Sequence, residues 1–185
     1  IIINYIVFLR AKGRESMDNR RYLLYCDMMT ELKLTNQLMN EYDSLPHDYG
    51  NAVLYQSEAH LIQCIGQNDS ITVTEASKLL KKTKSACSQM VKKLVGKNWV
   101  KQTRNQKNNR EYKLHLTEEG LIIYDHHENF DRMSYEHNSK ELYHFTDEEL
   151  QLYIKIQKRM NELIGLDVER SYNYFKADIS CINER

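Results

Sequence analysis

Hydrophobic side chains recur at helical spacing near the start of the chain. Leu24, Met28 and Leu32 follow one another four residues apart, in a segment from 20 to 43 that contains no proline or glycine. This spacing places the three side chains on one face of a helix. The segment therefore predicts one long helix with a broad apolar face.

A break separates this helix from a second one. Pro46 and Gly50 interrupt the apolar periodicity and are typical of a turn or loop. A second helix is expected over 56–65, ended by Gly66.

The central part of the chain contains two helix starts. Thr72 and Glu75 form a T-x-x-E capping box, which predicts a short helix over 73–80. Thr83 is predicted to cap a longer helix that is polar on one side and apolar on the other. The expected core face of this longer helix, at i, i+3, i+4 and i+7, comprises Cys87, Met90, Val91 and Leu94.

A β-hairpin is predicted after the longer helix. Trp99 and Val100 open the first strand, and the alternating Tyr112, Leu114 and Leu116 form its partner. A run of polar residues lies between the two strands at the turn. A short helix, a turn, a longer helix and a two-stranded hairpin together make a winged helix-turn-helix.

Two further helices are expected at the C-terminal end. Thr117 precedes a helix that should run to about residue 137. Thr146 and Glu149 form a second capping box, at the start of a helix over roughly 145–164. The apolar faces of the first and last helices exceed what a small winged domain can cover, which predicts a second copy of the chain as partner.

These elements define the expected fold class and domains. The fold class is mainly α with a small β-hairpin wing, a winged helix-turn-helix with flanking dimerisation helices. Residues 1–16 are expected to be a translated leader before a native start at Met17, or a disordered extension. The other expected parts are an N-terminal dimerisation helix over 17–50, a DNA-binding lobe over 51–116 and C-terminal dimerisation helices over 117–185.

The charge of the chain is distributed unevenly. Basic and acidic residues balance at 26 each, but residues 72–113 hold twelve basic and two acidic side chains. A neutral chain with one strongly basic segment is typical of a module that binds a polyanion. A solvated basic face without a partner is the other interpretation.

The exposed face of the Thr83 helix carries the side chains that DNA recognition needs. Ser and Gln side chains hydrogen-bond to base edges, and Gln pairs with adenine through two bonds. Lys and Arg contact phosphates, which positions a protein without specifying sequence. The candidate DNA-binding residues are Thr83, Lys84, Ser85, Ser88, Gln89, Lys92 and Lys93 on the helix and Arg104, Lys107 and Arg110 on the wing.

Several other classes of protein do not fit the sequence. The chain has no phosphate-binding glycine loop, nucleophile elbow or HExxH motif, so an enzyme is not expected. The initial apolar run IIINYIVFL is nine residues long, far below the roughly 20 that a membrane helix needs. Four scattered cysteines without CxxC spacing predict reduced thiols and a cytoplasmic protein.

Three segments of the chain resemble the MarR-type transcription regulators. SEAHLIQCIG, VTEASKLLKKTKSACSQMVKKLVGKNWV and YKLHLTEEG follow one another in the order and spacing of that family. The resemblance implies a homodimer whose two recognition helices and wings bind a pseudo-palindromic operator. At the wing tip the family commonly has an Asp two residues before an Arg. Here Asn108 precedes Arg110, which removes the charged brace of that Arg.

The resemblance also implies an effector, and three classes remain open. Zinc-sensing members draw their metal ligands from positions that correspond here to Glu41, His60, His127 and Asp131. Asp131 stands where a His is usual, although two nitrogens and two carboxylate oxygens would suit zinc. Packed or solvated histidines without a metal are the alternative.

The second class is a small apolar or acyl ligand. AHLIQCIG and YDHHENFD also resemble the fatty-acid-synthesis repressors of the family, which hold no metal. The third class is an oxidant that acts on a thiol at Cys26, although the neighbours of Cys26 differ from the redox-sensing pattern and a buried inert thiol is the alternative.

The sequence thus predicts a sequence-specific, double-stranded DNA-binding transcription regulator, a repressor that acts as a homodimer and responds to an effector. The alternatives are a zinc-responsive regulator of the same fold and a winged-helix protein-interaction module that does not bind DNA. No cofactor is required by the sequence; zinc is the metal that the candidate ligands would suit.

Overall fold

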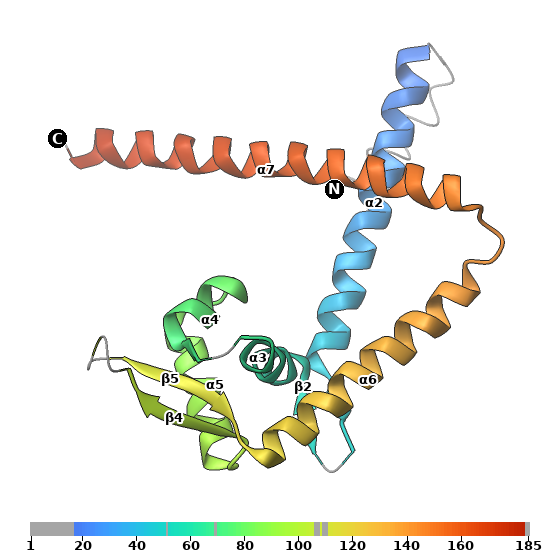
Figure 1. Cartoon of the computed structure of the whole chain (residues 1–185). Helices are drawn as coiled ribbons and strands as arrows, with labels where there is room; N and C mark the ends of the chain where they lie inside the picture. The colour runs from blue at the N-terminus through green and yellow to red at the C-terminus, as the bar shows by residue number, and fades with distance from the viewer. Residues whose placement is uncertain (1–16, 51, 69, 106–107, 109–110, 184–185) are drawn as a thin grey trace. The chain divides into compact units, whose positions relative to one another are not determined.

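The computed structural model describes residues 17–50, 52–68, 70–105, 108 and 111–183. The chain divides after Asp131 into two compact units, which are described separately (Figure 1). The predicted leader or extension over 1–16 lies outside the described residues. Among the residues that are described, no helix is long and apolar enough to cross a membrane.

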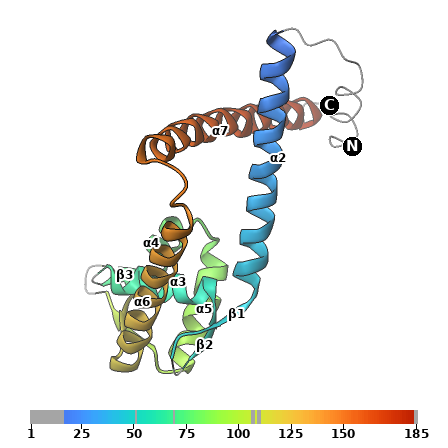
Figure 2. The same cartoon turned by 90° about the vertical axis from the view of Figure 1, so that its right-hand side faces the viewer.

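The first unit begins with a long helix and a small hairpin. Helix α2 spans Met17–Ser44, as the apolar spacing predicts. Strands β1 (Pro46–Asp48) and β2 (Val53–Tyr55) then pair antiparallel and lead from α2 into the next helix (Figure 2). Gly50, in the turn, has a φ of 79°, a conformation that favours glycine. The sequence predicted only a break at this place, because the strands are too short to show an alternating pattern.

The next three helices form the helix-turn-helix. They are α3 (Gln56–Gly66), α4 (Val73–Leu79) and α5 (Lys84–Gly96). The capping box of α4 is confirmed, since the backbone nitrogen of Thr72 donates to Glu75 Oε2 at 2.8 Å and Glu75 N donates to Thr72 Oγ1 at 3.2 Å. Thr83 caps α5 by accepting from the backbone nitrogen of Ala86 at 3.1 Å.

The wing is the hairpin of a three-stranded antiparallel sheet. Its strands are β3 (Ile71–Thr72), β4 (Val100–Arg104) and β5 (Tyr112–Leu116), in the order β3-β5-β4. Leu114, in the middle strand, has no exposed surface, whereas Tyr112 is 45% exposed. The predicted strand is therefore correct, but Tyr112 lies beyond the core.

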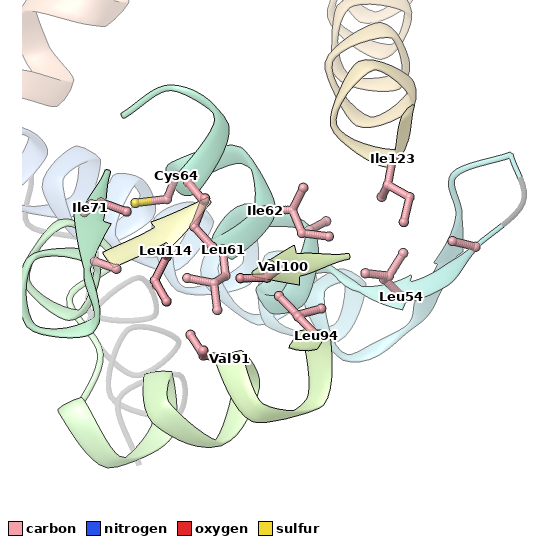
Figure 3. Packing of buried hydrophobic residues seen from close by; sticks show 14 of the residues in the cluster. Leu54, Leu61, Ile62, Cys64, Ile71, Val91, Leu94, Val100, Leu114 and Ile123 are labelled. Atoms are coloured by element: carbon pink, nitrogen blue, oxygen red, sulfur yellow. The ribbon is translucent and has the colours of Figure 1, made fainter. Parts of the chain in front are cut away.

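One hydrophobic core joins these elements of the first unit. Leu61, Ile62 and Cys64 of α3 meet Leu114 and Val100 of the sheet in this core, and α5 adds Val91 and Leu94 of its predicted apolar face (Figure 3). Met90 is only partly buried, at the edge of this core. The residues labelled in Figure 3 are Leu54, Leu61, Ile62, Cys64, Ile71, Val91, Leu94, Val100, Leu114 and Ile123.

Two longer helices follow the wing. Thr117 starts α6 (Glu118–Glu141), which ends four residues beyond the predicted position. Helix α7 (Asp147–Asn183) begins at the second capping box, where the Thr146 backbone nitrogen donates to Glu149 Oε2 at 2.9 Å. The mainly helical fold with a hairpin wing is that expected from the sequence.

Candidate nucleic-acid interface

The polar face of α5 lies on the surface of the first unit. Cys87, Val91 and Leu94 are buried on the opposite side of the helix, which leaves the residues between them directed outward. Lys84, Ser85 and Gln89 are exposed, and Ser88 is partly exposed. This is the face that the sequence assigned to base and phosphate contacts.

A groove of about 500 Å³ runs between α5 and the inner face of the wing. Five of the candidate DNA-binding residues contribute to it: Lys84, Ser85, Ser88, Gln89 and Lys92. The rest of the lining comes from the start of α4 and from the wing, and comprises Thr72, Val73, Thr74, Gln102, Glu111 and Tyr112. The groove brings α5 and the wing to one surface.

Three wing residues of the groove, Gln102, Glu111 and Tyr112, were missed by the sequence analysis, and strand register explains the first and the last of them. In the β4–β5 register Gln102 pairs with Leu114 and Arg104 pairs with Tyr112. Directly paired residues share one face of a sheet, and Leu114 defines the face that points to the core. Gln102 and Tyr112 therefore lie on the same face of the sheet as Leu114 but outside the core, where this face borders the groove. Their place in the groove can be predicted only when the pairing of β4 with β5 is known.

The candidate residues on the wing are only partly described. Arg104 is exposed at the end of β4. Lys107 and Arg110 lie outside the described residues. Asn108, which replaces the usual Asp, donates its backbone nitrogen to Asn105 O at 3.1 Å and accepts from Glu111 N at 2.9 Å.

Lys93 differs from the other candidate residues of α5. Its Nζ lies 2.6 Å from Oε1 of Glu58, a nearly buried acid in α3. Lys93 does not line the groove, although the preceding Lys92 does. The structure thus pairs Lys93 within the protein, a contact that no local sequence pattern indicates.

A cluster of histidine and aromatic rings lies beside the first half of α3. The ring of His127, from α6, is 5.7 Å from the ring of His60 and 5.1 Å from that of Tyr49, measured between centroids. His127 has no exposed surface. Burial lowers its pKa, and the neighbouring Asp131 carboxylate opposes this effect.

The cluster does not assemble the four expected metal ligands. His127 Nδ1 is 3.6 Å from Asp131 Oδ1, too far for a hydrogen bond, and His60 Nε2 is engaged with Gln56 Nε2 at 3.1 Å. Glu41 is exposed near the end of α2. Within the described part of the chain, no three His, Cys, Asp or Glu side chains are grouped so that they could hold a metal ion.

The cysteines show no arrangement of a reactive site in the part of the chain that is described. Cys64 and Cys87 are buried, and burial raises the pKa of both thiols. Cys26 is partly exposed on α2. The two buried thiols fit the inert state expected from the sequence.

The sequence of part of this chain is similar to that of known transcription regulators. The sequence profile of the MarR family matches residues 54–112. An uncharacterised HTH-type transcriptional regulator, YhjH of Bacillus subtilis (strain 168), is 25% identical over 114 residues. That match covers 61% of this chain and 65%, slightly less than two thirds, of the length of YhjH.

Solved structures share the fold. The zinc-responsive MarR family member ZitR of Lactococcus lactis superposes with a TM-score of 0.64 at 18% identity, over 76% of this chain and 99% of that one. FabT of Streptococcus pneumoniae, solved in complex with DNA, gives a TM-score of 0.59 at 23% identity, over 77% of this chain and 96% of that one.

The helix-turn-helix of α4 and α5, with the β4–β5 wing beside it, defines a winged helix-turn-helix protein. The family profile covers this part of the chain from β2 to the start of β5. Over these residues the chain is similar to MarR-family regulators, and it has the winged helix-turn-helix fold that their solved structures show.

Proposed function

We propose that this chain regulates transcription by binding double-stranded DNA sequence-specifically. In the proposal it is a cytoplasmic homodimer that represses genes from a pseudo-palindromic operator, with an affinity set by an effector. The observation that carries the proposal is the groove in which α5 presents Ser88 and Gln89 beside the wing.

The chemistry of the groove fits a DNA duplex. A helix enters the major groove, which is about 12 Å wide, and Gln and Ser hydrogen-bond to base edges there. Lys84 and Lys92, at the two ends of this exposed face, would contact phosphates on either side. Gln102 and Tyr112 are two further neutral hydrogen-bonding groups on the wing side.

The homodimer is supported by the apolar surface of the long helices. α7 exposes Leu152, Tyr153 and Ile154 in succession, and α2 exposes Leu34 and Leu38. An isolated chain with so much apolar surface on its helices would be prone to association. The division into dimerisation helices over 17–50 and 117–185 and a DNA-binding lobe over 51–116 is part of this proposal.

Binding to a random-sequence duplex and to the duplexes enriched from that pool would test the proposal. We expect tight binding of the enriched duplexes and a steep loss of affinity for both with added salt, because phosphate contacts release counterions. Weak or salt-insensitive binding to every duplex would instead indicate a winged-helix protein-interaction module.

The effector is proposed to act at the ring cluster, which comprises His60 of α3, His127 and Phe130 of α6, and Tyr42, His47 and Tyr49 from the end of α2 and the β1–β2 hairpin. The rings of Tyr49 and Phe130 meet edge to face with their centroids 5.6 Å apart, and the ring centroids of Tyr42 and His47 are 4.3 Å apart. Such rings favour a small apolar or acyl ligand.

Oxidation of the Cys26 thiol is the alternative effector mechanism. Loss of DNA binding after peroxide treatment in the wild type, but not in Cys26→Ser, would identify it.

A zinc-responsive regulator is the second candidate. It is favoured by His127, whose two ring nitrogens are buried without a hydrogen-bond partner among the described groups. The fold is also that of ZitR, a protein described as zinc-responsive. Metal analysis of protein purified without chelator tests this candidate: stoichiometric zinc that His127→Ala removes would establish it, and absence of zinc would leave the apolar ligand and the oxidation of Cys26.

A further inference from the structure

Lys93 of the recognition helix α5 is paired with an acid that belongs to the interior of the lobe. Its Nζ lies 2.6 Å from Glu58 Oε1, and the Glu58 side chain is only 5% exposed. The other oxygen, Oε2, accepts a hydrogen bond from the backbone nitrogen of Tyr55 at 3.3 Å. Both oxygens of the carboxylate thus have a partner. Of these two partners, Lys93 is charged and the backbone nitrogen of Tyr55 is neutral.

This pair resists competition from a DNA phosphate. If Lys93 turned outward to a phosphate, the nearly buried Glu58 carboxylate would lose its counter-charge, an unfavourable change that solvent around the half-exposed Lys93 side chain lessens but does not remove. The Tyr55 ring, 5.7 Å from Lys93 Nζ, adds a second attraction on the same side. Lys92 has no such partner in α3 and lines the groove instead.

The Lys93–Glu58 pair also gives α5 a directional contact with α3, which its apolar face does not provide. Val91 and Leu94 pack against the core through contacts that are not directional. An ion pair with a nearly buried, hydrogen-bonded carboxylate fixes one point of α5 relative to α3. Lys93 follows Gln89 by one helical turn, so this point lies close to the residues that face the groove.

We propose that Lys93 is a positioning residue and not a DNA contact: it ties the last turn of α5 to Glu58 of α3 and so sets the aim of Ser88 and Gln89. The inference rests on the proposed function of α5 as the DNA-reading helix. It separates two neighbouring lysines, of which Lys92 contacts phosphate and Lys93 contacts protein.

The salt dependence of binding to a random-sequence duplex distinguishes the two lysines. Lys92→Gln should reduce the slope of log affinity against log salt by about 0.9, the value for one lost phosphate contact. Lys93→Gln should leave that slope unchanged. An equal reduction in both variants would overturn the inference.

The preference for an enriched duplex over the random duplex reports on the aim of α5. Lys93→Gln and Glu58→Gln should each lower this preference by at least about threefold, and the double variant should be no worse than the more affected single one. Glu58→Gln keeps the shape of the side chain and removes only its charge. Unchanged preference in both single variants, at a temperature where circular dichroism shows both to be folded, would mean that the pair is merely structural and would overturn the inference.

A measurement on the unmodified protein covers the case in which a variant does not fold. Acylation of lysines, followed by mass spectrometry, should show Lys92 protected by the duplex and Lys93 equally reactive with and without it. Protection of Lys93 by DNA would contradict the inference. Failure of the wild-type chain to bind any duplex would instead contradict the proposed function itself.

Discussion

Gly120, in the first turn of α6, lies against the backbone of the residue that precedes β4. A Cβ at this position would collide with the carbonyl oxygen of Trp99. The close approach is held by Thr117, which donates its Oγ1 to Asn98 O at 2.6 Å and accepts from Gly120 N at 3.0 Å. The glycine therefore joins α6 to the base of the wing.

Gly120→Ala should lower the free energy of unfolding by about 2 to 3 kcal/mol, the usual cost of forcing an extra group into a packed contact. Urea unfolding measures the effect. Gly96→Ala is the matched control: a Cβ there meets nothing within 4 Å, and the change should be stabilising by at most about 1 kcal/mol. Similar unfolding energies for the two variants would contradict the contact.

Glu75 makes the stability of α4 depend on pH. Hydrogen bonds from the backbone and the hydroxyl of Thr72, each 2.8 Å long, lower the pKa of the Glu75 carboxyl. A carboxylate with a lowered pKa in the folded state contributes stability above its unfolded pKa, about 4.3, and loses it as pH falls through the folded value.

Glu75→Gln should therefore reduce stability by at most about 1 kcal/mol near pH 7, since the bond is exposed. The difference from the wild type should shrink as pH falls below about 4. Urea unfolding across this range checks the trend, and a constant difference at every pH would exclude a titrating cap.

At the scale of elements, α5 is expected to read sequence. Gln89→Ala should weaken binding to an enriched duplex by about 1 to 3 kcal/mol more than binding to a random duplex, because it removes a base contact. Lys92→Gln is the control and should weaken both about equally. Equal losses for Gln89→Ala on the two duplexes would end its assignment as a base reader.

The wing is expected to grip the DNA backbone. Arg110→Ala should weaken binding to enriched and random duplexes about equally and reduce the salt slope by about 0.9. Filter binding at several salt concentrations measures both. An unchanged slope would mean that Arg110, which follows the Asn108 that replaces the usual Asp, does not reach DNA.

Element boundaries were predictable where a local pattern sets them. Capping residues at Thr72, Thr83 and Thr146 act on backbone groups three residues away, so the sequence shows them directly. The β1–β2 hairpin was missed because its strands are three residues long. α7 extends well past the predicted end at residue 164 and continues through Gly165, since no proline follows to stop it.

At the scale of the whole molecule, the apolar surface of α7 should hold two copies together. Leu152, Tyr153, Ile154 and Ile156 are all exposed in the single chain. Ile154→Glu should shift the protein from dimer to monomer in sedimentation equilibrium and lower DNA affinity at least about tenfold, because two linked half-sites bind more tightly than one.

Lys155→Glu is the control for that change, since it introduces the same charged side chain at the neighbouring exposed position and leaves all four apolar side chains in place. It should remain dimeric. A dimeric Ile154→Glu variant with unchanged DNA affinity would show that this part of α7 is not the dimer surface.

The sequence by itself determined the helices, the wing, the polar face of α5 and the basic character of residues 72–113, because each depends on periodicity, on caps or on charge along a short stretch. The tertiary structure alone decided which of these side chains meet. Strand register places Gln102 and Tyr112 in the lining of the groove. Lys93 pairs with Glu58 and does not line the groove, and His127 is buried beside His60. Such contacts join residues far apart in the chain, and no local pattern encodes them.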